Sequence, residues 1–208
     1  MVDYNNFAKT FSKSRKNLKW PEIDYFIQYI SSNFKSKINI LDIWCGNWRI
    51  LKTLNNSWLE FSYLWTDSSE WMINEAKILF PENKFQTLDM LNMDKIWQKF
   101  DIIFFIASFH HLQTIEDRLN VLNKAKNLLN DWWIIMMTNW NLLWEMNFIK
   151  YKDSYIWNGD FNIKIGNFKR YYHSFGLDEL SKLFDLSGFE TIKNEFFDDE
   201  NNSLSIIK

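Results

Sequence analysis

Apolar residues recur along the chain with two alternating spacings. Short runs rich in β-branched and aromatic residues predict strands, at residues 38–43, 61–66, 85–88, 102–106 and 134–137. Between these runs, apolar positions three and four residues apart predict helices, at residues 47–55, 69–80 and 115–129. Central strands that are apolar on both faces and separated by helices predict a doubly wound, mostly parallel α/β sheet.

The two ends and one internal segment depart from this alternation. Residues 1–36 predict a basic segment followed by a helix from Pro21, together forming an N-terminal cap. Residues 140–174 are aromatic and polar, which indicates an insertion over the active site. After a helix at 176–186, runs at 189–197 and 203–207 predict a terminal antiparallel hairpin. Without repeats or Pro/Gly-rich linkers, the sequence predicts one domain over residues 1–208 with a seven-stranded sheet.

Composition narrows the class of protein. The chain is 47% hydrophobic and 24% charged, as in soluble globular proteins, which excludes disordered and collagen-like classes. A net charge of -2 excludes bulk electrostatic attraction to nucleic acid or membranes. One Cys and three His without ligand spacing predict no disulfide framework and no metal site. Without a signal peptide or a run of about 18 apolar residues, we expect a cytoplasmic protein with no membrane partner.

Two residue counts are unusual. The chain has 12 Trp and only 5 Gly, whereas ordinary usage of about 7% Gly predicts roughly 15. Glycine is the residue that adopts positive φ without a steric cost, so a fold with tight turns should not lack it. The position of each Trp therefore matters.

Polar residues follow the predicted strands at their carboxyl ends, where doubly wound sheets bind ligands. Residues 42–49 join the first strand to the next helix, and Asp67 ends the second strand. An acidic side chain about twenty residues after such a loop can accept hydrogen bonds from both ribose hydroxyls of an adenosine. Asp89 follows the third strand and is a candidate partner for the adenine amino group.

These segments resemble those of class I S-adenosylmethionine-dependent methyltransferases. Residues 41–49, Leu-Asp-Ile-Trp-Cys-Gly-Asn-Trp-Arg, are similar to the family's Asp-x-Gly-x-Gly-x-Gly motif. The resemblance implies a Rossmann-like fold, S-adenosylmethionine as cofactor and methyl transfer as the activity. The cofactor-binding residues that it implies are Asp42, Trp44, Cys45, Gly46, Asn47, Trp48, Asp67, Ser68, Asp89, Met90 and Ala107.

Tryptophan stands where this family has glycine. The seven positions are Trp44, Trp48, Trp58, Trp65, Trp71, Trp132 and Trp133. Such selective placement favours the hypothesis that the source reads UGA as glycine and that the printed sequence translates UGA as tryptophan. The alternative is a genuine Trp-bearing chain with a degenerate cofactor site.

Two further segments are more selective. Residues 11–15 followed by Trp20-Pro21, and residues 170–175 (Arg-Tyr-Tyr-His-Ser-Phe), resemble the wobble-uridine tRNA methyltransferases. Residues 107–112, followed by Arg118, match the same family. Those enzymes esterify 5-carboxymethyluridine in the anticodon loop. The resemblance implies tRNA as a partner and, as in eukaryotes, a small zinc-binding activator subunit.

A carboxylate acceptor needs alignment more than a strong base, because its oxygen is already nucleophilic at neutral pH. Arginine holds a carboxylate through a two-pronged fork, so Arg15 and Arg170 are the candidate anchors. We expect His110, Tyr171 and His173 to line the same pocket. Arg15 in a solvated basic tail, and a structural role for one of His110 and His111, are the alternatives. For the whole chain, the alternatives are a small-molecule O- or C-methyltransferase and a catalytically inactive binding module.

Overall fold

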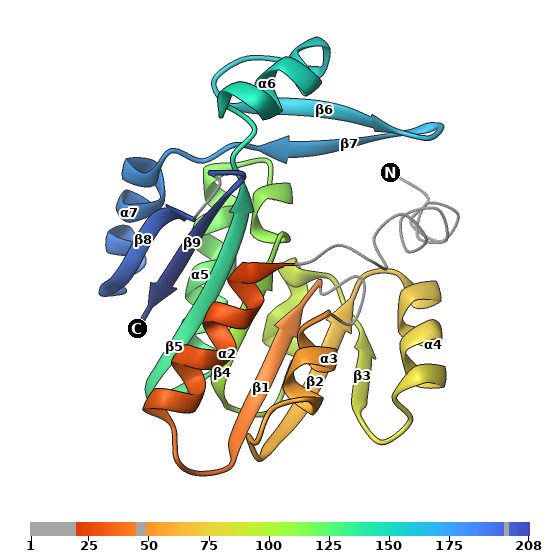
Figure 1. Cartoon of the computed structure of the whole chain (residues 1–208), viewed down its shortest axis with the longest axis vertical. Helices are drawn as coiled ribbons and strands as arrows, with labels where there is room; N and C mark the ends of the chain where they lie inside the picture. Colours follow the sequence, from red (N-terminus) through yellow and green to blue (C-terminus); the bar gives the residue numbers. More distant parts are fainter. Residues whose placement is uncertain (1–19, 45–48, 198–199) are drawn as a thin grey trace.

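A computed structural model describes residues 20–44, 49–197 and 200–208 (Figure 1). Its helices are α2 (Pro21–Asn33), α3 (Arg49–Asn55), α4 (Glu70–Leu79), α5 (Ile115–Leu128), α6 (Glu145–Tyr151) and α7 (Leu177–Leu186). Three short 3-10 helices are η1 (Met90–Lys95), η2 (Phe109–His111) and η3 (Lys152–Ser154). The strands are β1 (Ile38–Ile43), β2 (Phe61–Asp67), β3 (Lys84–Thr87), β4 (Phe100–Ile106), β5 (Leu129–Trp140), β6 (Asp160–Ile165), β7 (Phe168–His173), β8 (Thr191–Phe197) and β9 (Asn202–Ile207).

The main sheet has seven strands in the order β3-β2-β1-β4-β5-β9-β8. Strands β1 to β5 pair in parallel, whereas β9 runs antiparallel to β5 and β8 antiparallel to β9. The predicted mixed α/β fold with a mostly parallel sheet and a terminal antiparallel hairpin is confirmed.

Helices cover both faces of this sheet. On one face, α2, α3 and α4 pack against side chains such as Ile40 and Ile102. On the other, α5, α7 and η1 pack against Leu41 and Ile103. Because adjacent residues of one strand point to opposite faces, the strands must be apolar on both sides, as their sequences are.

Local signals explain where several helices begin. Pro21 occupies the first turn of α2, where a missing N–H costs nothing. The Ser69 side chain caps α4 by accepting from the Met72 N–H, and Thr114 caps α5 by accepting from the Asp117 N–H. Each cap satisfies a backbone donor that the helix leaves open.

A second, two-stranded sheet formed by β6 and β7 lies beyond the carboxyl ends of the parallel strands (Figure 1). It has a small core of its own, in which Phe161, Ile163 and Tyr172 are buried with Leu142. Sequence periodicity showed only that residues 140–174 interrupt the α/β alternation. The hairpin was missed although residues 160–165 alternate between polar side chains and buried apolar ones, which is the pattern of a half-buried strand.

The sequence-based boundaries differ from the structure at the fifth strand. Residues 129–133 were not assigned to a strand, yet β5 begins at Leu129 and continues to Trp140. Its pairing with β4 shifts register between Phe100 and Ile102, so an irregularity absorbs the extra residues. No described helix is long and apolar enough to cross a lipid bilayer.

Candidate functional site

The predicted cofactor side of the site lies where β2 and β3 end. Asp67 is the last residue of β2 and only 8% exposed, and its Oδ1 accepts a hydrogen bond from the Ser69 N–H at 2.8 Å. Asp89 follows β3 and is half-buried, with its Oδ1 2.9 Å from the Leu91 N–H that it caps. One oxygen of each carboxylate is therefore used to fix its orientation. The parallel pairing of β2 with β3 places both carboxylates at the same edge of the sheet.

Trp44, directly after β1, is a poor fit to a cofactor site because of its bulk and its backbone conformation. Trp44 has a φ of +54° and donates its backbone N–H to the Thr66 carbonyl at 2.9 Å. This left-handed conformation is uncommon for any side chain and an outlier for a bulky one, whereas glycine adopts it freely. The Trp44 indole is partly buried against the core. The two carboxylates suit the hydroxyl and amino groups of an adenosine, but the backbone at position 44 suits glycine.

The other predicted cofactor-binding residues differ in their burial and in their hydrogen bonds. Asp42 is buried within β1 and accepts from the Tyr63 hydroxyl at 2.5 Å. Met90 is a core residue at 1% exposure, while Ser68 is half-buried beside Asp67. Ala107 follows β4 with a φ of +51° and donates its N–H to Thr138. The predicted positions Cys45, Gly46, Asn47 and Trp48 lie outside the described residues.

The residues predicted to bind the methyl acceptor lie on η2 and β7, apart from Arg15. His110 and His111 follow β4, with ring centroids 4.4 Å apart. Arg170 lies on β7, and its guanidinium carbon is 6.0 Å from the centre of the Trp44 ring and 5.9 Å from that of the Tyr172 ring. The hairpin thus brings one predicted anchor, Arg170, to the end of β1. The other predicted anchor, Arg15, lies outside the described residues.

Tyr171 and His173 belong to a hydrogen-bonded network below the hairpin. The His173 Nδ1 lies 2.6 Å from Asp160 Oδ1, and its Nε2 lies 2.9 and 3.0 Å from the two Glu179 carboxylate oxygens. The Tyr171 hydroxyl donates to Asp160 Oδ1 at 2.6 Å. Burial, followed by this hydrogen bond, raises the pKa of the Tyr171 phenol above its usual value. Both side chains are therefore held in place by carboxylates.

Arg118 of α5 completes this network, in which the sequence had assigned it no role. It is 6% exposed and donates to Glu179 at 3.2 Å and to the Tyr171 hydroxyl at 3.3 Å. Its guanidinium also lies 4.9 Å from the centre of the Phe175 ring. A signal was present, because Arg118 shares the helix face of the buried residues Val121, Leu122 and Ala125.

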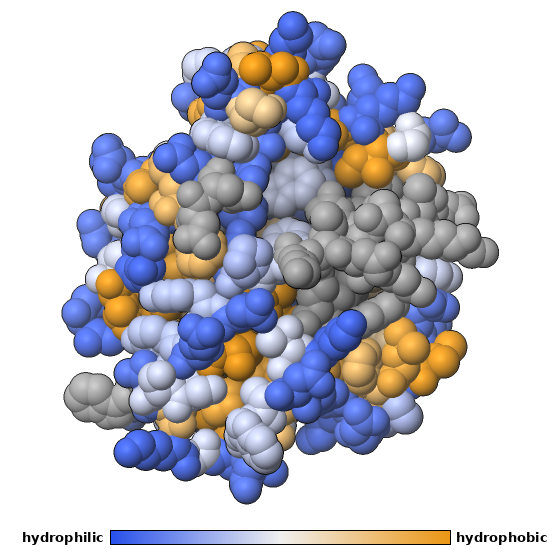
Figure 2. Space-filling model, in the orientation of Figure 1, coloured by the Kyte–Doolittle hydropathy of each residue, from blue (hydrophilic) through white to orange (hydrophobic). Residues whose placement is uncertain are grey.

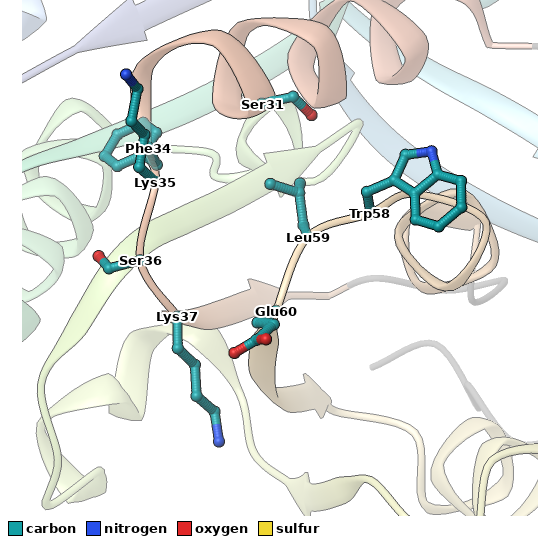
Figure 3. Close-up of a pocket in the computed structure, with 8 residues that line it drawn as sticks. All are labelled: Ser31, Phe34, Lys35, Ser36, Lys37, Trp58, Leu59 and Glu60. Carbon is teal, nitrogen blue, oxygen red and sulfur yellow. The ribbon is translucent and has the colours of Figure 1, made fainter.

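A separate hollow of about 510 Å³ lies at the opposite end of the sheet (Figure 3). The α2–β1 and α3–β2 connections line it, with Lys35, Lys37 and Glu60 at its rim and Trp58 at one side (Figure 3). Because it lies where the parallel strands begin, it is remote from Asp67 and Asp89.

Comparison with known proteins finds similarity to methyltransferases in sequence and in fold. Residues 40–131, which run from β1 into the start of β5, match the family model of a methyltransferase domain. The match covers less than half of the chain. The matched region contains both carboxylates and the histidine pair, whereas the β6–β7 hairpin lies outside it.

One relative and two solved structures are also similar to this chain. The putative methyltransferase 235L of Invertebrate iridescent virus 6 is 32% identical over 105 residues, which cover 42% of this chain and 39% of the viral protein. A crystal structure of an S-adenosylmethionine-dependent methyltransferase from Clostridium acetobutylicum ATCC 824 has a TM-score of 0.73 at 16% identity, covering 100% of this chain and 99% of its own. The S-adenosylmethionine-bound amino pentose methyltransferase CalS10 of Micromonospora echinaspora has a TM-score of 0.68 at 14% identity, covering 100% and 96%.

The chain therefore has the fold of class I S-adenosylmethionine-dependent methyltransferases, and S-adenosylmethionine is the cofactor that this fold implies. The match to the viral relative spans less than half of that protein.

Asp67 provides a direct test of the cofactor side. In a chain with Trp44→Gly and Trp48→Gly, we expect Asp67→Asn to weaken S-adenosylhomocysteine binding about 10- to 100-fold, since a hydrogen bond to a charged group contributes about 1.5–3 kcal/mol. Isothermal titration calorimetry measures the change. Glu116→Gln, an identical carboxylate-to-amide change at an exposed residue of α5, is the matched control. Equal losses of affinity in Asp67→Asn and Glu116→Gln would contradict the assignment of Asp67 to cofactor binding.

Proposed function

We propose that this chain transfers a methyl group from S-adenosylmethionine to the carboxymethyl group of a wobble uridine in tRNA. Bound S-adenosylmethionine supplies an electrophilic methyl group on its sulfur. A carboxylate oxygen forms a bond to that methyl carbon while the carbon–sulfur bond breaks and its electron pair stays on sulfur. The products are a methyl ester and S-adenosylhomocysteine, and no proton is moved.

The observation that carries this proposal is the position of Arg170. The guanidinium lies beside Trp44 and Tyr172, at the carboxyl edge where the cofactor carboxylates also lie. A guanidinium fork holds a carboxylate in a fixed orientation, and such alignment is what this methyl transfer requires. The resemblance of residues 170–175 to the wobble-uridine enzymes supports the same acceptor.

The β6–β7 hairpin also has a surface suited to an RNA backbone. Lys164 and Lys169 are exposed and face each other across the two strands. Hydrophilic residues gather at the tip of the hairpin, at the upper right of the space-filling view (Figure 2). Lysines in such a position can contact phosphates, which position an RNA rather than specify its sequence.

Methyl transfer to tRNA tests the acceptor class. The chain with Trp44→Gly and Trp48→Gly is incubated with S-adenosylmethionine labelled in its methyl group and with bulk tRNA lacking the wobble ester. We expect label to enter the tRNA and to be released by mild alkali, which hydrolyses an ester. Intact cofactor binding without transfer would favour a small-molecule acceptor, and absence of cofactor binding would favour a binding module.

Salt dependence tests the RNA surface separately. Each phosphate contact contributes a slope of about -0.9 to the dependence of log K on log salt for duplex nucleic acid, and about -0.7 for single strands. We expect Lys164→Gln with Lys169→Gln to make the slope for tRNA binding shallower by about one to two. Lys77→Gln, at an exposed residue of α4, should leave the slope unchanged. A slope that is flat in the parent chain would contradict RNA binding.

We also propose that the seven tryptophans at family glycine positions are encoded by UGA and translated as glycine in the source. The positive φ of Trp44 supports this, because that backbone conformation favours glycine. Trp58 supports it as well, because its side chain is 103% exposed in a turn and gains nothing from packing. Trp65 is the position least in keeping with the hypothesis, because it is fully buried and lies 5.4 Å from the Phe85 ring.

Mass spectrometry of the protein isolated from its own source decides between the two residues. We expect peptides that contain positions 44, 58 and 71 to carry glycine, whereas a peptide that contains Trp20 carries tryptophan. Tryptophan at position 44 in the native protein would refute the recoding hypothesis.

A further inference from the structure

Both nitrogens of the His173 ring face carboxylate oxygens. Nδ1 lies 2.6 Å from Asp160 Oδ1, and Nε2 lies 2.9 and 3.0 Å from the two carboxylate oxygens of Glu179. Asp160 belongs to β6, whereas Glu179 belongs to α7, which packs on the main sheet. The His173 ring therefore joins the β6–β7 hairpin to the body of the domain.

The other hydrogen bonds of these two carboxylates indicate that both are ionised. Asp160 Oδ1 also accepts from the Tyr171 hydroxyl at 2.6 Å. Burial, followed by this bond, raises the pKa of the Tyr171 phenol, so the hydroxyl keeps the proton that it donates. Glu179 Oε1 also accepts from the Arg118 guanidinium at 3.2 Å. Because an ionised carboxylate only accepts hydrogen bonds, both nitrogens of His173 must donate, and this requires the doubly protonated imidazolium.

The imidazolium also balances the charges gathered around it. In the part of the chain that the structure describes, the network contains three other charged groups, which are Asp160 from β6, Glu179 from α7 and Arg118 from α5. Tyr171 on β7 contributes a neutral hydroxyl. With the imidazolium, two positive charges face two negative ones. With a neutral ring, one negative charge is left over in a half-buried place, which is unfavourable.

Close packing leaves the His173 ring little room to turn away from the carboxylates. Gly159, next to Asp160, has a φ of +84°, and a Cβ there would lie 2.8 Å from the Ser174 carbonyl oxygen and 3.4 Å from His173 Cε1. The centroid of the Phe175 ring is 4.6 Å from that of the imidazole. A neutral ring held in this space has one nitrogen lone pair facing a carboxylate oxygen, so loss of a proton replaces one of the two hydrogen bonds by a repulsion.

We propose that His173 is a proton-dependent clamp that fastens the β6–β7 hairpin to α7. The doubly protonated ring donates to Asp160 and to Glu179, whereas the neutral ring keeps only one of these bonds. Stability from the clamp is therefore present while the ring holds both protons, and it is lost as rising pH removes one. Because the hairpin lies beyond the carboxyl ends of the parallel strands (Figure 1), the clamp sets how firmly that edge is covered. The proposal holds for any methyl acceptor.

Nitrogen NMR of the histidine side chains tests the charge of the ring without any assay of activity. The chain contains three histidines, and His173→Gln removes one set of imidazole signals and so assigns it. We expect both ring nitrogens of His173 to carry a proton at about pH 5.5 and only one of them at about pH 8.5. The same number of ring protons at both pH values would overturn the proposal.

Amide hydrogen exchange tests the clamp itself, with His173→Gln as a neutral side chain that does not titrate. Rates are expressed relative to those of the unstructured chain at each pH. From about pH 5.5 to about pH 8.5, we expect the protection of β6 and β7 in the parent to fall about tenfold relative to the variant, which is a modest loss for a bond to a charged group. The amides of α2 should show no such difference. Equal pH dependence of hairpin protection in the parent and in His173→Gln would overturn the clamp.

Glu179→Gln separates the clamp from a general effect of pH. The amide of this variant can accept from a protonated ring through its oxygen or donate to a neutral ring through its nitrogen. We expect the protection of the hairpin in Glu179→Gln to vary little between about pH 5.5 and about pH 8.5. A loss of protection as large as that in the parent chain would show that the contact between His173 and Glu179 does not fasten the hairpin.

Discussion

Substitution of Trp44 and Trp48 by glycine is expected to raise the affinity for S-adenosylmethionine by on the order of 100-fold, or about 2.7 kcal/mol. At position 44 the backbone already has a φ of +54°, so glycine relieves strain there. Glycine also removes an indole from the end of β1, beside Arg170 and His111. A loop without Cβ atoms lets the backbone approach a ligand closely, as in other doubly wound nucleotide sites.

Calorimetric titration of both chains with S-adenosylmethionine measures this gain. Trp97→Gly is the matched control, because Trp97 is 96% exposed just before β4, at the opposite end of the sheet. The control should bind as weakly as the parent chain. Tight binding by the chain with both tryptophans would contradict the account of the cofactor loop.

Removal of the His173 imidazole is expected to lower the free energy of unfolding by about 2 kcal/mol. His173 is 4% exposed and bridges Asp160 of β6 and Glu179 of α7, so His173→Ala leaves two carboxylates facing a gap. The loss should be smaller than the roughly 3–5 kcal/mol found for fully buried pairs, because the Glu179 side chain is 41% exposed and partly screened by water.

Thermal unfolding followed by circular dichroism measures this loss, which corresponds to a decrease in Tm of roughly 4–8 °C for a chain of this size. Lys208→Ala is the control, because Lys208 pairs with Glu190 on the surface at 3.2 Å with both side chains largely exposed. Such a pair contributes about 0–1 kcal/mol. An equal change in the two variants would show that the His173 network does not anchor the hairpin.

The parallel core could be predicted from sequence because its signal is local. Strands such as β1 are short, apolar on both faces and separated by amphipathic helices, and this pattern specifies both type and order. Asp67 and Asp89 could be located for the same reason, since Asp67 ends β2 and Asp89 comes shortly after β3, at the carboxyl edge where such sheets bind ligands.

The acceptor side could not be predicted in the same way, because its contacts join distant segments. Arg118 meets Tyr171 and Glu179 across 53 and 61 residues, and no periodicity along the chain encodes such a meeting. Tyr171 and His173 were expected to line the pocket on the basis of residue type. Their hydrogen bonds to Asp160 and Glu179 depend on how the hairpin packs against α7, which only the tertiary structure reveals.

At position 44 the sequence and the structure give different information. The sequence marked Trp44 as a residue at a family glycine position, and the structure adds a backbone conformation that favours glycine. Neither the pattern nor the composition could give that angle. The Trp44 N–H still pairs with the Thr66 carbonyl of β2, so the chain leaves the extended strand conformation at position 44 itself.

A crystal structure of the chain with Trp44→Gly and Trp48→Gly, grown with S-adenosylhomocysteine, tests the central claim most directly. We predict that the ligand lies at the carboxyl edge of the sheet, with its ribose hydroxyls bonded to the Asp67 carboxylate and its adenine amino group beside Asp89. Density for the ligand only at another place, such as the hollow between the α2–β1 and α3–β2 connections, would contradict the account.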